Sequence, residues 1–176
     1  MTPDDQRYQA YIAILNEELV PAMGCTEPIA IAYAAARARE LLGVEPERVV
    51  VEASNNIIKN VKSVVVPNTG GLRGLAASAA AGIVAGQAHK VLEVLADIPA
   101  ADQQRIKAFL EQKQIDAVES HSGLVFDLII TLFAGQEKAL VQISHYHTNI
   151  VLMAKNDKVV YENQDCDEVE TASMTE

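Results

Sequence analysis

Apolar side chains recur every three or four residues at the start of the chain, a spacing that predicts helices. The first helix is expected from about residue 4 to residue 20, where Pro21 ends it. Its apolar face would carry Tyr8, Tyr11, Ile12, Leu15 and Leu19. A second, alanine-rich helix is expected after a tight connector at 24–28, with Thr26 as its N-cap and Gly43 as its end.

Small residues dominate the middle of the chain, from about residue 68 onward. A glycine-rich loop at 68–71 leads into a small-residue helix, expected over about 72–85. Gly86 should kink or break this helix before it continues to residue 95. A further amphipathic helix follows, and its apolar face would carry Ile106, Phe109 and Leu110.

Runs that are rich in valine, or in which apolar and polar residues alternate, predict strands in two parts of the chain. In the middle of the chain, runs at 48–54 and 63–66 flank a polar connection at 55–60. The last third predicts five more strands, at 115–119, 124–133, 138–144, 149–154 and 158–161. Short turns between neighbouring strands indicate antiparallel pairing, so the expected class is α+β, an antiparallel sheet covered by alanine-rich helices. We expect one domain over 1–162 and an acidic, flexible tail at 163–176.

Composition indicates a globular protein and argues against several functions. Hydrophobic residues make up 49% of the chain and charged residues 22%, and the apolar stretches are too short to cross a bilayer. A formal net charge of -10 without a basic patch argues against nucleic acid and anionic membranes as partners. Two cysteines without disulfide-framework spacing, and a start that lacks the layout of a secretory signal, predict a cytoplasmic location.

The first candidate for chemistry is Cys25, just ahead of a predicted helix. Free backbone N–H groups and the helix dipole favour a thiolate there, which could serve as a nucleophile or a metal ligand. A small buried residue in a helix connector explains the same pattern. Glu27 beside it could be nothing more than an acid in the first helical turn.

Two polar loops are the next candidates. One holds Ser54, Asn56, Lys59 and Asn60. Amide and ammonium groups of this kind can bind the carboxylate and amino groups of a small substrate, although an ordinary strand connection has the same composition. The other loop, at 67–71, directs backbone N–H groups and a helix start at whatever lies in front of it, although a glycine turn before a helix is common.

The fourth candidate is the segment 145–149. His145 and His147 have a spacing that places both on one face of a strand, where they could bind a metal. No third ligand is near them in the sequence. A hairpin rim with one exposed and one hydrogen-bonded histidine is therefore the favoured interpretation.

Four motifs occur in order along almost the whole chain: Gly24-Cys25-Thr26-Glu27-Pro28, Ser54-x-Asn56-x-x-Lys59-Asn60, Val66-Pro67-x-Thr69-Gly70 and His147-Thr148-Asn149-Ile150. Their order and spacing resemble the L-cysteine desulfidase family, which is related to the L-serine dehydratase alpha chain and to uncharacterised proteins of the UPF0597 type. The combination is far more specific than any single motif. It extends from the first helix to about residue 161.

The resemblance implies a pyridoxal-independent lyase with a four-iron four-sulfur (4Fe-4S) cluster. Such an enzyme converts L-cysteine to pyruvate, ammonia and sulfide, or dehydrates L-serine. The resemblance assigns Cys25 as a cluster ligand, with Lys59 and His147 as candidate catalytic groups for proton transfer. The small amino-acid substrate would then be bound by Ser54, Asn56, Asn60, Thr69, Gly70, Thr148 and Asn149.

The chain departs from this family in length. Members are about twice as long, and their other cluster cysteines lie in a C-terminal half, whereas Cys166 matches none of those ligands. We therefore expect an N-terminal portion that lacks the cluster and is inactive until a complementary half or subunit joins it. Two alternatives remain: a non-catalytic domain for self-association or scaffolding, and a thiol hydrolase that uses Cys25, His147 and Asn149.

Overall fold

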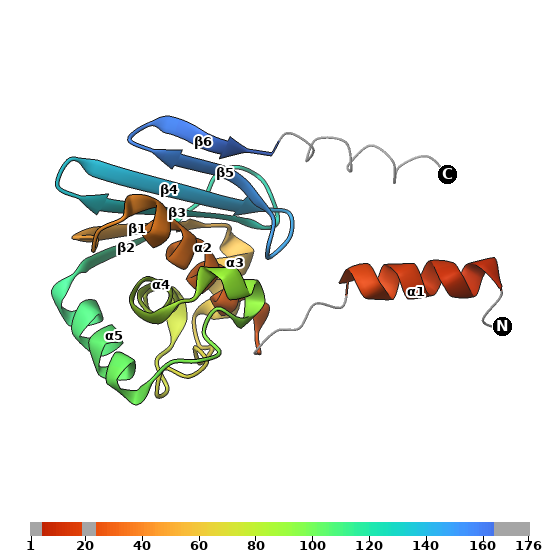
Figure 1. The fold of residues 1–176 in the computed structure, drawn as a ribbon, viewed down its shortest axis with the longest axis horizontal. Coiled ribbons are helices and arrows are strands. Elements are labelled where there is room, and N and C mark those ends of the chain that lie inside the picture. The colour runs from red at the N-terminus through yellow and green to blue at the C-terminus, as the bar shows by residue number, and fades with distance from the viewer. Residues whose placement is uncertain (1–4, 19–23, 164–176) are drawn as a thin grey trace.

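The computed structural model describes residues 5–18 and 24–163, and it has the α+β architecture that the sequence predicts. One six-stranded sheet forms the upper layer in Figure 1, and the helices that follow α1 lie beneath it. The helices are α1 (Gln6–Glu18), α2 (Thr26–Leu42), α3 (Asn55–Val61), α4 (Gly74–Ala85), the 3₁₀ helix η1 (Ala88–Glu93) and α5 (Ala100–Gln112). The strands are β1 (Arg48–Ala53), β2 (Gln114–Glu119), β3 (Asp127–Ala134), β4 (Glu137–Ser144), β5 (Ile150–Lys155) and β6 (Lys158–Glu162).

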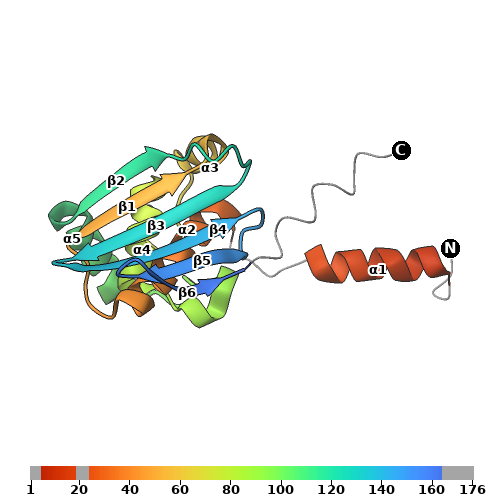
Figure 2. The same ribbon diagram turned by 90° about the horizontal axis from the view of Figure 1, so that it is seen from above.

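The sheet has the strand order β2-β1-β3-β4-β5-β6, seen from above in Figure 2. Four neighbouring pairs are antiparallel, as predicted, but β1 and β2 are parallel. The reason is the connection between them, which carries α3, α4, η1 and α5 and so forms a long crossover instead of a hairpin. The short turns at 135–136 and 156–157 are hairpins, as expected.

Two local predictions in the middle of the chain are wrong. The segment 55–60 is not a strand connection, because it forms α3, in which Ile57 and Val61 are buried one helical turn apart. The run 63–66 is not a strand, since its only pairing is an isolated bridge between Val65 and Arg73. Local β-branching predicted a strand there, yet no neighbouring strand is available to pair with it.

The alanine-rich helices pack at unusually short range. Helix α2 lies between the sheet and α4, and its alanines at 30, 32, 34, 36 and 38 are fully buried. A methyl group added at Gly82 of α4 would lie 2.2 Å from the Ala32 carbonyl oxygen, and one added at Gly86 would lie 2.9 Å from the Ala36 Cβ. Gly86 ends α4, so the expected continuation to residue 95 is instead the separate helix η1.

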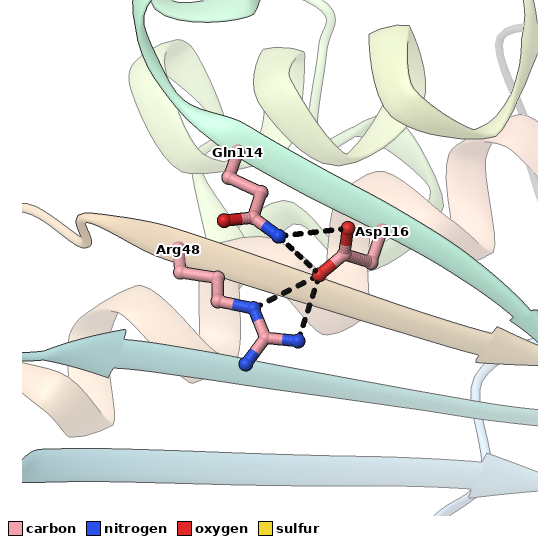
Figure 3. Close-up of polar contacts among 3 residues, drawn as sticks. All are labelled: Arg48, Gln114 and Asp116. Atoms are coloured by element: carbon pink, nitrogen blue, oxygen red, sulfur yellow. Dashed lines mark hydrogen bonds and ion pairs between the residues drawn. The ribbon is translucent and has the colours of Figure 1, made fainter.

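The outer face of the sheet is not covered by a second layer in the part of the chain described. Figure 3 shows an ion pair on this face at the β1–β2 edge, where Arg48 Nε and Nη2 both contact Asp116 Oδ2, at 2.9 and 2.8 Å. Gln114 also donates to Asp116, and the Arg48 guanidinium lies 5.5 Å from the centre of the Phe133 ring. These contacts join the parallel pair across its solvent-facing side.

The first helix is confirmed over residues 6–18, but its apolar side is not buried among the described residues. Tyr11, Ile14 and Leu15 are 55, 54 and 47% exposed, and α1 stands apart from the sheet in Figures 1 and 2. Leu19 and all but the first residue of the predicted tail at 163–176, including Cys166, lie outside the described residues. Among the described helices, none is both long enough and apolar enough to span a membrane.

The α2–α4 contact predicts a large effect of Gly82→Ala. Alanine usually stabilises an open helical position by about 1 kcal/mol relative to glycine, but here the methyl group meets backbone that cannot rotate away. We expect a loss of about 1–3 kcal/mol or more in the free energy of unfolding, measured by urea denaturation.

Gly43→Ala is the control, because a methyl group there meets nothing within 4 Å and only the left-handed backbone, with φ of 82°, opposes it. A Gly82→Ala protein as stable as the original chain would contradict the close helix contact.

Candidate functional site

The first motif lies at the N-terminal end of α2. Cys25 is the N-cap residue, with an extended backbone (φ -61°, ψ 125°), and Thr26 is the first residue of the helix. Thr26 is therefore not the cap that the sequence predicted. Its hydroxyl is instead 3.1 Å from His147 Nε2 in the β4–β5 loop, 121 residues away, and forms a hydrogen bond there.

A chain of hydrogen bonds joins this helix start to α3. The Cys25 thiol donates to Glu27 Oε2 at 3.0 Å, and the Asn60 side-chain amide donates to Glu27 Oε1 at 3.0 Å. Both oxygens of one carboxylate are thus held by groups from two motifs. Glu27 was given only a structural role from the sequence, yet it is the residue that connects the two motifs.

The proton between Cys25 and Glu27 resides on sulfur. Partial burial raises the pKa of the Cys25 thiol, and the Glu27 carboxylate raises it further, against a smaller opposing effect of the Glu27 backbone N–H. Burial alone would raise the pKa of Glu27, but its hydrogen bonds from Cys25, its own backbone N–H and Asn60 lower it overall. The prediction that the helix start favours a thiolate is therefore wrong here, because partial burial disfavours the charged sulfur and the Glu27 carboxylate accepts the hydrogen bond of the thiol.

His147 is half-buried between Thr26 and Phe126. The Phe126 ring centre lies 4.5 Å from that of His147, with the planes tilted by 57°. Burial lowers the pKa of His147, although the nearby Glu27 charge opposes the shift. A neutral imidazole at neutral pH follows, which can accept a proton. His145 is exposed, so the two histidines divide as the hairpin-rim interpretation predicted.

The remaining residues of the second motif take different positions. Ser54 is 5% exposed, and its hydroxyl donates to the Val125 carbonyl oxygen at 2.9 Å. Asn56 and Lys59 are exposed on α3. Asn56 lies four residues before Asn60, and Lys59 directly precedes it. Positions i, i+3 and i+4 share one helix face, so these two side chains lie on the side of α3 that carries Asn60.

The third motif forms a braced loop. Gly24 lies beside it, since a methyl group there would be 3.8 Å from Pro67 Cγ. The Thr69 hydroxyl is fully buried and donates to the Val66 carbonyl oxygen at 2.8 Å. Gly70 has a left-handed backbone, with φ of 74°, which favours glycine. In this arrangement the loop supports the connector around Cys25, and the Thr69 hydroxyl is turned inward.

Thr148 and Asn149 belong to a different part of the surface from Cys25. They line a hollow of about 330 Å³ with Tyr33, Arg37 and Tyr161, among others. The Asn149 side-chain amide also donates to the Ser144 carbonyl oxygen. A larger cavity, of about 380 Å³, includes Arg39, Glu40 and Gly43 at the C-terminal end of α2, the opposite end from Cys25.

The described residues do not by themselves fit a 4Fe-4S cluster. Such a cluster is held by several thiolates, and residues 5–18 and 24–163 contribute one cysteine, Cys25, which is exposed. No group of three or more potential metal ligands occurs in this part of the chain. Cys25 could at most be one ligand of a cluster whose other ligands come from elsewhere.

A buried carboxylate, which no sequence motif indicated, supports the His147 loop. Asp127 is fully buried and accepts hydrogen bonds from the Ser120 hydroxyl at 2.7 Å and from the Ser144 hydroxyl and the Gln142 amide at 2.8 Å each. Burial alone would raise its pKa, but these hydrogen bonds together lower it. The adjacent Phe126 carbonyl accepts from the His145 N–H, so Asp127 anchors the strand end on which the Phe126–His147 contact depends.

The chain is similar to longer bacterial proteins of uncharacterised function. It is 52% identical over 167 residues, 95% of its length, to a UPF0597 protein of Desulfitobacterium hafniense, and the match covers 39% of that protein. It is 43% identical over 162 residues to a UPF0597 protein of Treponema denticola, covering 92% of the chain and 38% of the relative. A third UPF0597 protein, from Fusobacterium nucleatum, is 41% identical over 156 residues, 89% of the chain and 36% of the relative. The chain thus spans less than two-fifths of these relatives. No family model and no solved structure matches it.

The Asp127 network predicts a pH-dependent loss of stability in Asp127→Asn. The variant replaces an acceptor of three hydrogen bonds with an amide, which we expect to cost about 1–3 kcal/mol at pH 7 in urea denaturation. The pKa of Asp127 is lowered in the folded protein. The carboxylate therefore contributes fully to the free energy of unfolding above the unfolded-state pKa of about 3.9, and this contribution is lost as pH falls through the pKa of the folded protein. The difference between the two proteins should therefore shrink in acid.

Asp116→Asn is the matched control, since it removes a carboxylate of an exposed ion pair, and such pairs contribute little. Equal effects of the two substitutions at pH 7 would show that Asp127 is not the anchor described above.

Proposed function

We propose that this chain is part of a UPF0597-type protein that acts as a pyridoxal-independent lyase on L-cysteine or L-serine. The similarity to UPF0597 proteins over most of the chain supports the family, and the resemblance of the four motifs to cysteine desulfidases supports the activity. One observation carries the proposal: Cys25, Glu27 and Asn60 are joined by hydrogen bonds, and Thr26 joins them to His147. Three of the four motifs thus meet at one end of α2.

The proposed reaction is a β-elimination. A base removes the proton on Cα, the electron pair forms a Cα–Cβ double bond, and the Cβ–S or Cβ–O bond breaks with release of sulfide or water. The resulting aminoacrylate takes up water and gives pyruvate and ammonia. His147 is suited to accept the proton because it is neutral. The exposed Lys59 and Asn56 on α3 are available to bind the substrate carboxylate.

The iron–sulfur cluster stays part of this proposal as a group that the whole protein would assemble. Cys25 would supply one ligand, and the other thiolates would come from a complementary segment beyond the described residues. When bound, such a cluster would supply a Lewis acid for the leaving group. Ligation requires a thiolate, so the Cys25 thiol would have to give up the hydrogen bond that it now donates to Glu27.

The two alternatives have different support. A thiol hydrolase would need Cys25 activated by His147, but the Cys25 hydrogen bond runs to Glu27 and the His147 Nε2 contact runs to Thr26. A scaffold domain is favoured by the uncovered outer sheet face, where Ile129, Phe133 and Leu140 are partly exposed. The scaffold interpretation is therefore the second candidate.

A chimera tests the proposal. This chain replaces the matching segment of the Desulfitobacterium hafniense relative, and the protein is purified and reconstituted with iron and sulfide without oxygen. We expect pyruvate formation from L-cysteine or L-serine, and we expect Cys25→Ser to lower both iron per chain and the rate by at least tenfold. Cys166→Ser is the matched control, because the family motifs assign no role to that residue.

Iron content unchanged by Cys25→Ser would remove Cys25 from the ligands. A chimera and a native relative that both bind iron but form no pyruvate from either amino acid would overturn the lyase and support the scaffold.

A further inference from the structure

The hollow beside Thr148 and Asn149 is distinct from the Cys25 site. It lies between α2 and the β5–β6 hairpin, and its lining is mixed, with Tyr33, Arg37, Thr148, Asn149, Ile150, Met153 and Tyr161. Tyr33 is seven residues beyond Thr26 on α2, about 10 Å along the helix axis. A cysteine or serine molecule held at Cys25 is too short to reach Arg37, a further turn away, so the proposed reaction does not use this hollow.

Arg37 lines this hollow and has one unsatisfied donor. Its Nη1 donates to Glu40 at 3.1 Å in a pair that is well exposed on both sides, 37% for Arg37 and 43% for Glu40. Its Nε is buried and has no hydrogen-bond partner, the one such side-chain atom in the part of the chain that the structure describes. A buried donor without an acceptor is unfavourable, so the guanidinium gains if an acceptor enters.

The tyrosines add an apolar and hydrogen-bonding wall. Tyr33 is 8% exposed, and burial raises the pKa of its hydroxyl, so it stays protonated and able to donate. Arg37, Glu40 and Tyr161 are the charged or titratable groups near enough to Tyr33 to influence it. Ile150 and Met153 supply apolar surface from β5.

We propose that this hollow binds a small organic carboxylate through Arg37. The Nε–H and one terminal N–H of a guanidinium lie on the same edge and match the two oxygens of a carboxylate. Because Nε is enclosed, the Arg37 head group turns toward the hollow when the ligand enters, and its exposed pair with Glu40 offers little resistance. The apolar body of the ligand then packs between the tyrosine rings and Met153.

Titration of the ¹⁵N-labelled chain tests this site, with benzoate as the probe and benzamide as its neutral isostere. We expect benzoate to shift the amide resonances of residues 33–37 and 148–153 and to bind at least tenfold more tightly than benzamide. Arg37→Gln should weaken benzoate binding at least tenfold. Arg7→Gln on α1 removes the same charge far from the hollow and should leave binding unchanged.

Arg37→Lys is a second variant in case Arg37→Gln fails to fold, because lysine keeps the positive charge and the long aliphatic chain. It lacks the two parallel N–H donors of the guanidinium, so it should also weaken benzoate binding. Three results would overturn the proposal: no shifts with benzoate, equal binding of benzamide, or full binding in a folded Arg37→Gln chain. Tighter binding of inorganic phosphate than of benzoate would overturn the assignment to carboxylates. None of these results depends on lyase activity or on iron.

Discussion

The contact between α2 and α4 is the constraint on which the site depends. Helix α2 lies directly between the sheet and α4, and the space for it exists because Gly82 of α4 and Gly86 at its C-terminal end have no side chains where they meet Ala32 and Ala36 of α2. Larger residues there would separate the two helices and shift α2 relative to the strands. The N-terminal end of α2 would then no longer meet α3 and the β4–β5 loop, from which Asn60 and His147 reach it.

The chemistry at that end is governed by one carboxylate. Glu27 receives hydrogen bonds from Cys25 and Asn60, and its charge also opposes the lowering of the His147 pKa. The site therefore holds a protonated thiol, an ionised carboxylate and a neutral imidazole. This combination suits a site that is completed by further ligands more than a self-sufficient nucleophile, because nothing in the described residues removes the thiol proton.

The sequence predicted the elements that have strong local signals. The helical period and the turn residues predicted α2, α4, α5 and the five C-terminal strands, β2 to β6, since Gly43, the hairpin turns and the buried face of α5 act locally. It failed where tertiary packing decides the outcome: α3 forms because Ile57 and Val61 find a core to enter. Parallel pairing of β2 with β1 could not be deduced without knowing that the crossover between them folds back.

For the site, the motif resemblance brought together Cys25, Asn60 and His147, which lie in segments far apart in the chain. The residues that link them were not predicted from the sequence, because the pattern predicts only ordinary roles for both: an acid in the first helical turn for Glu27 and an N-cap for Thr26. Asp127 and Arg37 were missed for a similar reason, since a single charged residue in a strand or helix carries no pattern. Burial, visible only in three dimensions, is what distinguishes them.

The gathering of these segments around Cys25 can be measured directly with a nitroxide on that thiol in a chain carrying Cys166→Ser. Cys25 is exposed and accepts the label, and the amide signals of residues 57–61 and 145–149 should then be strongly broadened. Signals of residues 42–46 should be much less affected, because they follow the far end of α2, about 25 Å away along its axis. Sharp signals at 57–61 and 145–149 in the labelled protein would contradict the account.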